Sequence, residues 1–150
     1  YLIADEAFTA AGLVNYEVSN WARPGYEARH NLAYWRSDDW WGFGPGAHSH
    51  VNGVRWWNLR HPAAYTAKLA AASSPAQARE ILTADERRVE RVLLELRLSD
   101  GLPLDVLTAS EVARLPELAA AGFLEVTERF LRFSRSGRLL ADGVIRSLLD

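Results

Sequence analysis

The pattern of hydrophobic and polar residues is most regular between residues 83 and 97. Four apolar residues recur there at the i, i+3, i+4, i+7 spacing that lines one face of a helix: Val89, Val92, Leu93 and Leu96. Just before them, Thr83 and Glu86 have the spacing of a capping box, in which two side chains satisfy backbone N–H groups at a helix start. The pattern predicts a helix that begins near Thr83 and ends before Gly101.

Residues 123–134 alternate in the manner of a β-hairpin that turns at Glu128-Arg129. A register centred on that turn forms three cross-strand pairs: Val126 with Leu131, Leu124 with Phe133, and Glu125 with Arg132. The last pair has opposite charges, which favours this register.

Helical segments surround this hairpin. Short helices are expected over about residues 103–107 and 115–121, and Gly122 ends the second. A last helix begins near Ser136 and has apolar residues four apart: Leu140, Val144 and Leu148. Helices, a hairpin and a final helix predict a small winged-helix-like domain of α+β class over residues 76–150.

The first half of the chain predicts α/β structure. Residues 2–11 have helical character and Gly12 ends them, whereas residues 13–19 form a short strand. A helix followed by a strand is half of a βαβ unit, which predicts a parallel sheet. Residues 40–47 predict a second strand, and Pro62 begins another helix. The small, breaker-rich run at residues 70–76 places a boundary near residue 75, between domains 1–75 and 76–150.

The composition excludes several classes of protein. The chain has 17 basic and 19 acidic residues, so its net charge of −2 provides no attraction to nucleic acid. No Cys is present, which excludes disulfides and thiolate-held metals within these residues. No apolar run is long enough to span a membrane, so a soluble, cytoplasmic protein is expected. The chain starts at Tyr1 and contains no Met, as a fragment of a longer protein would.

Candidate chemistry is concentrated in residues 16–53, which hold three of the four His, four of the six Trp and five of the ten Gly. One motif there is His30-Asn31-Leu32-Ala33-Tyr34-Trp35. Its imidazole could ligate iron or exchange a proton near neutral pH, and its aromatic rings could lie against a planar ligand. In the alternative interpretation, His30 is satisfied by backbone at a loop corner and the aromatic rings close a core.

The second motif is an alternation of Gly42, Gly44 and Gly46, followed by His48. It differs from a dinucleotide-binding fingerprint in spacing and by its proline. Alternating glycines on a strand would let a ligand or another backbone approach closely, with His48 at the mouth of a barrel. Tight packing against a helix is the alternative. His48 and His50 lack a third ligand at a recognisable spacing, so no protein-only metal site is predicted.

Aromatic pairs at residues 40–41 and 56–57 could stack nucleic-acid bases, but no basic track accompanies them. Residues 116–121, which would be the recognition helix of a winged-helix domain, contain no Arg, Lys, Asn or Gln to read bases. The sequence therefore indicates core packing for the Trp pairs and no nucleic-acid partner.

Several ordered motifs together carry a family resemblance over essentially the whole chain. They are residues 16–20, 22–25, 30–35 and 42–49, followed by Leu82-Thr83, Glu90, Leu96-Arg97, Gly101 and Gly122. They resemble the oxygen-independent coproporphyrinogen III oxidase-like radical SAM proteins, and within that group the HemW-like branch with its His-Asn-x-x-Tyr-Trp motif. The resemblance implies the last strands and helices of a partial (β/α) barrel and the C-terminal domain.

The resemblance also implies cofactors and a function. The whole protein would bind S-adenosylmethionine and a [4Fe–4S] cluster on a cysteine loop that this chain lacks, so the chain alone would not be active. The HemW-like branch binds haem and delivers it to membrane haemoproteins, which would allow peripheral membrane association. The sibling branch oxidises coproporphyrinogen III, but the residues at His48 and Ala33 depart from its pattern. His30, Asn31, Tyr34, Trp35 and His48 are thus candidate haem or porphyrin contacts, with His30 as the candidate iron ligand. A non-catalytic docking module is a third interpretation.

Overall fold

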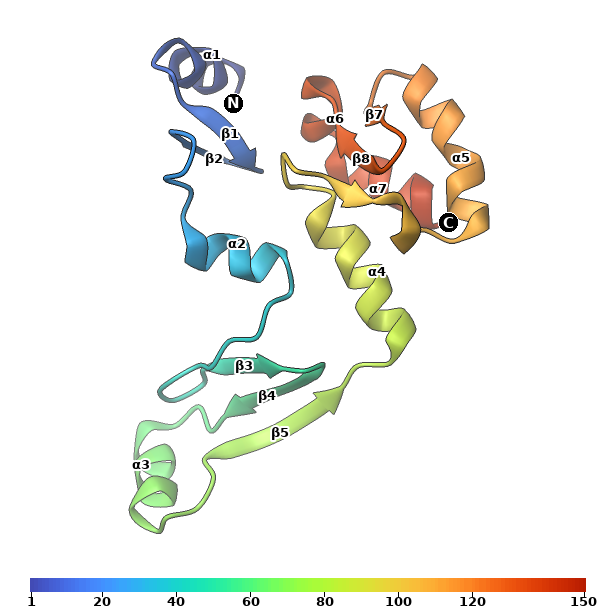
Figure 1. Ribbon diagram of the computed structural model, residues 1–150. Helices are drawn as coiled ribbons and strands as arrows, with labels where there is room; N and C mark the ends of the chain where they lie inside the picture. The colour runs from blue at the N-terminus through green and yellow to red at the C-terminus, as the bar shows by residue number, and fades with distance from the viewer. The chain divides into compact units, whose positions relative to one another are not determined.

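The computed structural model describes residues 1–150, which form two compact units. Unit 1 consists of residues 1–36 and 88–150, and unit 2 of residues 37–87. Figure 1 shows the order of the elements along the chain, from α1 to α7. The structure mixes helices with three small sheets, and every strand pair in it is antiparallel. The predicted boundary near residue 75 falls inside unit 2.

The N-terminal part of unit 1 contains four elements: α1 (Leu2–Ala10), β1 (Val14–Glu17), β2 (Asn20–Ala22) and α2 (Arg29–Trp35). Gly12 follows α1 with a φ of +77°, so the predicted helix stop is confirmed. Contrary to the prediction, β1 has no parallel neighbour within residues 1–150; it pairs antiparallel with β2, register Val14 to Ala22. Only Val18 and Ser19 separate the two strands, and such a short connection can join only antiparallel neighbours.

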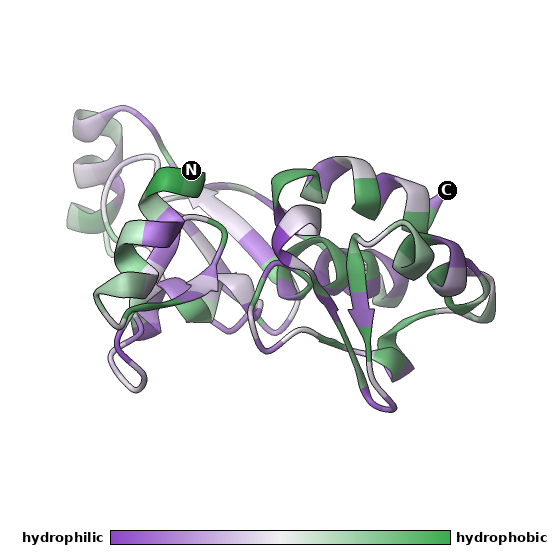
Figure 2. Ribbon diagram, turned by 90° about the horizontal axis from the view of Figure 1, so that it is seen from above, coloured by the Kyte–Doolittle hydropathy of each residue, from purple (hydrophilic) through white to green (hydrophobic).

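The C-terminal part of unit 1 holds the apolar core. Its elements are the end of α4 (Ala84–Glu95), β6 (Leu102–Pro103), the 3₁₀ turn η1 (Leu104–Val106), α5 (Ala109–Ala120), β7 (Leu124–Val126), β8 (Phe130–Phe133), α6 (Arg135–Leu139) and α7 (Ala141–Leu149). The strands form a sheet of order β6-β8-β7. Figure 2 shows hydrophobic and hydrophilic residues interspersed along these helices, as expected where one face packs on a core. The buried apolar cluster comprises Val92, Leu96, Leu102, Val106, Leu115, Leu124, Leu131, Phe133, Val144, Ile145 and Leu148.

The hairpin prediction is confirmed in register as well as position. Leu124 pairs with Phe133, Glu125 with Arg132 and Val126 with Leu131. Arg132 Nε lies 2.8 Å from Glu125 Oε2, so the expected ion pair forms. The capping box at the start of α4 is also confirmed, since Glu86 Oε2 accepts the Thr83 N–H at 2.8 Å and Thr83 Oγ1 accepts the Glu86 N–H at 3.2 Å.

Three helices differ from their predicted extents. The helix expected over residues 103–107 is only the 3₁₀ turn η1 (Leu104–Val106), because Leu102 and Pro103 belong to β6. The helix expected from residue 115 begins at Ala109, because Thr108 and Glu111 form a second capping box that starts it earlier. The last helix is divided into α6 and α7 at Leu140, whose φ of −119° interrupts the helical backbone. Ser134 caps α6 by accepting the Gly137 N–H at 3.0 Å.

Unit 2 is a three-stranded antiparallel sheet with one helix. Its strands, β3 (His48–Val51), β4 (Val54–Asn58) and β5 (Ala76–Ile81), pair in that order, and α3 (Pro62–Ala70) begins at the predicted proline. The sequence pattern did not reveal β5, because all six of its residues are exposed and no apolar alternation marks it.

The strand predicted over residues 40–47 is wrong. Only Trp40 forms a bridge, with His50, and the following residues form a loop. Pro45 has no N–H to donate to a ladder, and Gly44 and Gly46 have φ values of +101° and +69° that a strand does not use.

Buried polar groups hold this glycine loop in place. Asn58 Nδ2 donates to the Gly44 carbonyl at 3.0 Å, and Ser49 Oγ accepts the Gly42 N–H at 3.0 Å. The Tyr65 hydroxyl accepts the Gly44 N–H at 3.2 Å. A Cβ placed on Gly42 would lie 2.0 Å from the His48 carbonyl oxygen, so the loop closes onto its own backbone at this position.

Polar contacts join the two parts of unit 1. The Asp5 carboxylate of α1 accepts the Trp21 indole N–H at 3.0 Å and the Arg135 Nε–H at 2.7 Å. Arg138 donates to the Asn15 side chain, and the Ser99 N–H donates to the Tyr16 carbonyl at 3.1 Å. These bonds hold β1 and α1 against residues 88–150 of the same unit.

None of the helices combines the length and the apolar character that crossing a bilayer requires.

We expect Gly42→Ala to destabilise unit 2 by about 1–3 kcal/mol, because the new methyl group must displace the His48 carbonyl. Thermal unfolding followed by Trp fluorescence measures the loss, since four of the six Trp lie in this unit. Gly143→Ala is the control, because a Cβ there meets nothing within 4 Å and lies in a helix. A Gly42→Ala variant that melts at the same temperature as the parent protein would contradict the close approach of the His48 carbonyl to Gly42.

The Asp5 contacts predict a pH-dependent stability. The Trp21 hydrogen bond, with a smaller effect from Arg135, holds the pKa of the Asp5 carboxyl below its ordinary value against the opposing effect of burial. Such a group stabilises the fold above its unfolded-state pKa of about 3.9, and the contribution is lost as the pH falls through the lower folded-state pKa. Asp5→Asn should therefore lower the free energy of unfolding by about 1–2 kcal/mol at pH 7.

Urea unfolding at pH 7, 5 and 3 tests this expectation, and the difference between parent and variant should shrink toward pH 3. Glu6→Gln is the matched control, because Glu6 is exposed and lies 3.6 Å from Arg135. An Asp5→Asn deficit that is the same at pH 3 as at pH 7 would show that the charge of Asp5 does not stabilise the fold.

Candidate functional site

The helix α2 carries the His-Asn-x-x-Tyr-Trp motif. Its i, i+4 spacing places His30 and Tyr34 on the same face, where the Tyr34 ring meets the imidazole edge-on with centroids 4.8 Å apart. Both side chains are exposed, whereas Trp35 is half-buried. The loop-corner alternative for His30 is wrong, because the residue lies within a helix and faces solvent.

Asn31 turns toward the β1–β2 hairpin. Its Nδ2 donates to Glu17 Oε1 at 3.3 Å, and Asn20 donates to the same oxygen. Glu17 is only 2% exposed, although it is a carboxylate. Asn15 Nδ2 donates to the Glu17 carbonyl at 2.6 Å and completes a buried polar network beneath α2.

Sequence reasoning did not identify Glu17 or Asn15 as parts of the site. Both are buried beside Tyr16, so both faces of β1 are covered at these positions. The available signal was the placement of two polar residues at alternate positions around Tyr16. That signal does not separate a buried network from an ordinary exposed strand face.

His48 lies in unit 2, as the first residue of β3. Its ring stacks on Trp57, the cross-strand partner on β4, with centroids 5.8 Å apart and planes 27° apart. The side chain is exposed, so the imidazole is available to a ligand on this face of the sheet. Because His48 and its neighbouring glycine loop belong to unit 2, they form a second candidate site, separate from that of α2.

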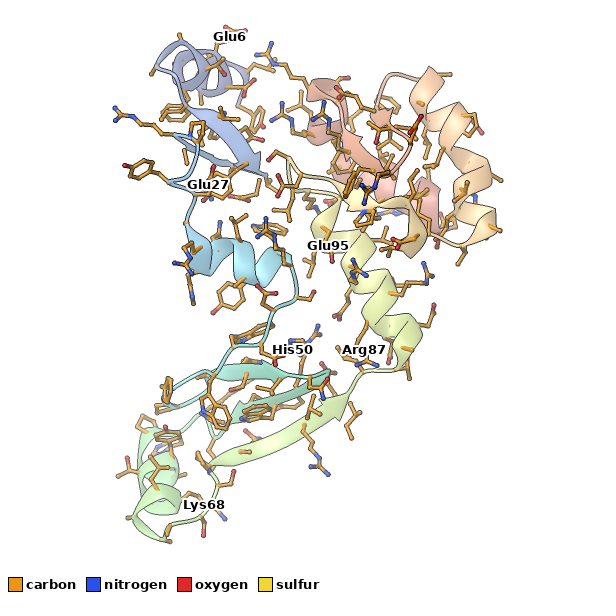
Figure 3. All side chains as sticks on the ribbon, in the orientation of Figure 1. Glu6, Glu27, His50, Lys68, Arg87 and Glu95 are labelled. Carbon is orange, nitrogen blue, oxygen red and sulfur yellow. The ribbon has the colours of Figure 1, made fainter.

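His50, two residues later on β3, has a different environment (Figure 3). It is 6% exposed and packs against Trp40 with ring centroids 4.9 Å apart. Its Nδ1 lies 3.4 Å from the Asp38 carbonyl, and its Nε2 has no hydrogen-bond partner. No group of three His, Cys, Asp or Glu side chains is close enough to hold a metal ion.

A cavity of about 620 Å³ lies elsewhere in unit 1. Its walls are mainly apolar, with two arginines among them: Leu118, Phe123, Leu139, Leu140, Arg97 and Arg138. None of the site residues that the sequence predicted lines it. The volume falls in the range of small-molecule sites.

The family comparison matches residues 82–140 to the HemN C-terminal domain. That range begins just before α4, includes the β6-β8-β7 sheet and ends at the break between α6 and α7.

Curated relatives extend the similarity over the rest of the chain. A protein of Mycobacterium tuberculosis named heme chaperone HemW is 48% identical over 149 residues, which are 99% of this chain and 38% of that protein. The heme chaperone HemW of Bacillus subtilis is 31% identical over 99% of this chain and 41% of its own length. The chain thus spans about two fifths of the length of the curated relatives it matches.

Among solved structures, the coproporphyrinogen III oxidase HemN of Escherichia coli, described as a radical SAM enzyme, matches with a TM-score of 0.72. The two are 19% identical, and the match covers 98% of this chain and 39% of that one, so it shows a common fold. The antiparallel sheets and the C-terminal helices described above are therefore a portion of this fold. Sequence and structure agree that the chain belongs to the HemW-like, oxygen-independent coproporphyrinogen III oxidase-like radical SAM family and matches its C-terminal portion.

Proposed function

We propose that this chain is the C-terminal portion of a haem chaperone, which binds haem and delivers it to haemoproteins, membrane haemoproteins among them. The observation that carries the proposal is the exposed imidazole of His30, held edge-on to Tyr34 on one face of α2. The names of the relatives at 48% and 31% identity support it. A cytoplasmic location with peripheral association at membranes would suit the delivery step.

The α2 residues fit a haem group. A neutral imidazole nitrogen is a common iron ligand, and His30 presents its ring to solvent. Haem, when bound, supplies the iron and a planar apolar face. Tyr34 and Trp35 would contact that face, and Asn31 would fix the helix beneath it. On unit 2, His48, stacked on Trp57, is proposed as a separate haem or porphyrin contact together with the backbone of Gly42, Gly44 and Gly46.

The whole protein is proposed to use S-adenosylmethionine and a [4Fe–4S] cluster. Because these 150 residues contain no Cys, the thiolates that hold the cluster would come from outside them. In this proposal residues 1–75 complete a partial (β/α) barrel. Residues 76–150 then form the winged-helix-like C-terminal domain.

Oxidation of coproporphyrinogen III is a second candidate function, favoured by the fold shared with the Escherichia coli oxidase. The exposed, Trp-stacked His48 argues against it, because the resemblance places an apolar residue there in the oxidase branch. Product analysis after anaerobic turnover of the full-length protein with coproporphyrinogen III discriminates the two. We expect no decarboxylated product.

A docking role for the C-terminal module is a third candidate, favoured by the mainly apolar 620 Å³ cavity and the exposed Leu139 and Leu140 among its lining residues. A protein without residues 76–150 would lose this surface. If both haem transfer and partner binding survived that deletion, the docking role would be excluded.

We expect His30→Ala in the full-length protein to weaken haem binding at least about tenfold, equivalent to about 1.4 kcal/mol, because the iron loses its proposed ligand. Titration followed at the Soret band measures the affinity and reports the ligand set through the band position.

His61→Ala is the matched control for this experiment. His61 is also an exposed histidine beside a helix, at the start of α3, but it lies outside both candidate sites. Its replacement should leave the titration unchanged. A His30→Ala protein with the parent affinity and Soret position would overturn the role of His30.

A further inference from the structure

We propose that Glu17 is the positioning residue for the haem-contacting helix, acting through Asn31. This inference rests on the proposed function, in which α2 contacts haem. It adds a residue that lies on a strand, outside the His-Asn-x-x-Tyr-Trp motif, and it assigns a purpose to a buried carboxylate.

Glu17 is buried and connects two elements through its side chain. The residue ends β1 and is 2% exposed. One oxygen, Oε1, accepts N–H groups from two side chains, Asn20 on β2 and Asn31 on α2. A single buried atom therefore connects the hairpin to the motif helix.

A contact from outside the helix matters for α2 because the helix is short. α2 has seven residues, no side-chain cap at its N-terminus and no buried residue. A helix this short is marginal without tertiary contacts. Directly after the helix, Arg36 forms an ion pair with Asp100 at 2.8 Å, but both partners are exposed, so that pair contributes little.

The chemistry of the carboxylate also fixes the orientation of Asn31. An ionised carboxylate only accepts hydrogen bonds, so it selects the NH₂ end of each amide that faces it. Hydrogen bonds to a charged acceptor are stronger than those between neutral groups, and burial strengthens them further. Glu17 thereby holds the Asn31 amide in one orientation and fixes the rotation of the helix that carries His30.

The test uses the full-length protein with two readouts, hydrogen exchange of the α2 amides and haem titration at the Soret band. Glu17→Ala should raise exchange of the α2 amides. It should also weaken haem binding by about tenfold, the lower end of the range found for residues that orient a metal ligand. Glu17→Gln should recover most of both, because its carbonyl oxygen can accept the same N–H groups without the negative charge. Glu125→Ala, which removes an exposed ion pair in the β7–β8 hairpin, is the control and should change neither.

Asn31→Ala removes the same hydrogen bond from the helix side, and it replaces Glu17→Ala in the test if that variant does not fold. It should reproduce both effects, and combining it with Glu17→Gln should add nothing. Parent-like α2 exchange in Glu17→Ala or in Asn31→Ala would overturn the proposal. If haem binding by the parent protein depends on His30, a variant with faster α2 exchange but unchanged haem affinity would also overturn the proposal. Haem binding that does not depend on His30 would overturn the proposed haem-ligating role of His30 instead, and the exchange readout would still decide whether Glu17 positions α2.

Discussion

Polar bonds, and not an apolar core, hold the N-terminal segment of unit 1 in place. Every residue of the buried apolar cluster lies between Val92 and Leu148. The buried residues of the segment before Arg36 are Asp5, Asn15, Tyr16 and Glu17, three of which are polar. Because a buried polar group is costly when it loses its partner, each of these bonds constrains geometry strongly.

This constraint has a consequence for the candidate site. Apolar packing tolerates small rotations of a helix, whereas a hydrogen bond to a buried carboxylate requires a narrow range of distance and direction. The helix α2 has no buried residue and is held by Asn31 on Glu17. Its exposed face is therefore free to carry His30 and Tyr34 while its inner face keeps a fixed orientation. A ligand that needs both iron coordination and a flat contact would use such a face.

Local patterns predicted the parts of the fold in which neighbours in sequence are neighbours in space. The β7–β8 register and the α4 capping box depend on residues within about ten positions, and both are confirmed. The strand expected at residues 40–47 does not form, although glycines alternate there, because Pro45 lacks an N–H group and Gly44 and Gly46 have positive φ values. The exposed β5 carried no pattern, because its pairing with β4 places neither face against a core.

The candidate site was predictable to the same degree. His30, Asn31, Tyr34 and Trp35 were singled out because their motif is contiguous and α2 keeps them together. Glu17 was missed because its partners lie three and fourteen positions away and meet it only in the folded chain. The same holds for Asn58, whose amide holds the Gly44 carbonyl across fourteen positions. Hydrogen bonds between buried polar groups that are distant in sequence produce no periodic pattern from which they could be predicted.

The central claim is that an α2 imidazole coordinates haem iron. The most direct measurement is pulsed EPR of the ferric haem complex of the full-length protein, prepared with ¹⁵N-imidazole histidine. The account predicts hyperfine coupling to a histidine nitrogen in the parent protein and its loss in His30→Ala, with His61→Ala unchanged. Histidine coupling that persists in His30→Ala, or none in the parent protein, would contradict it.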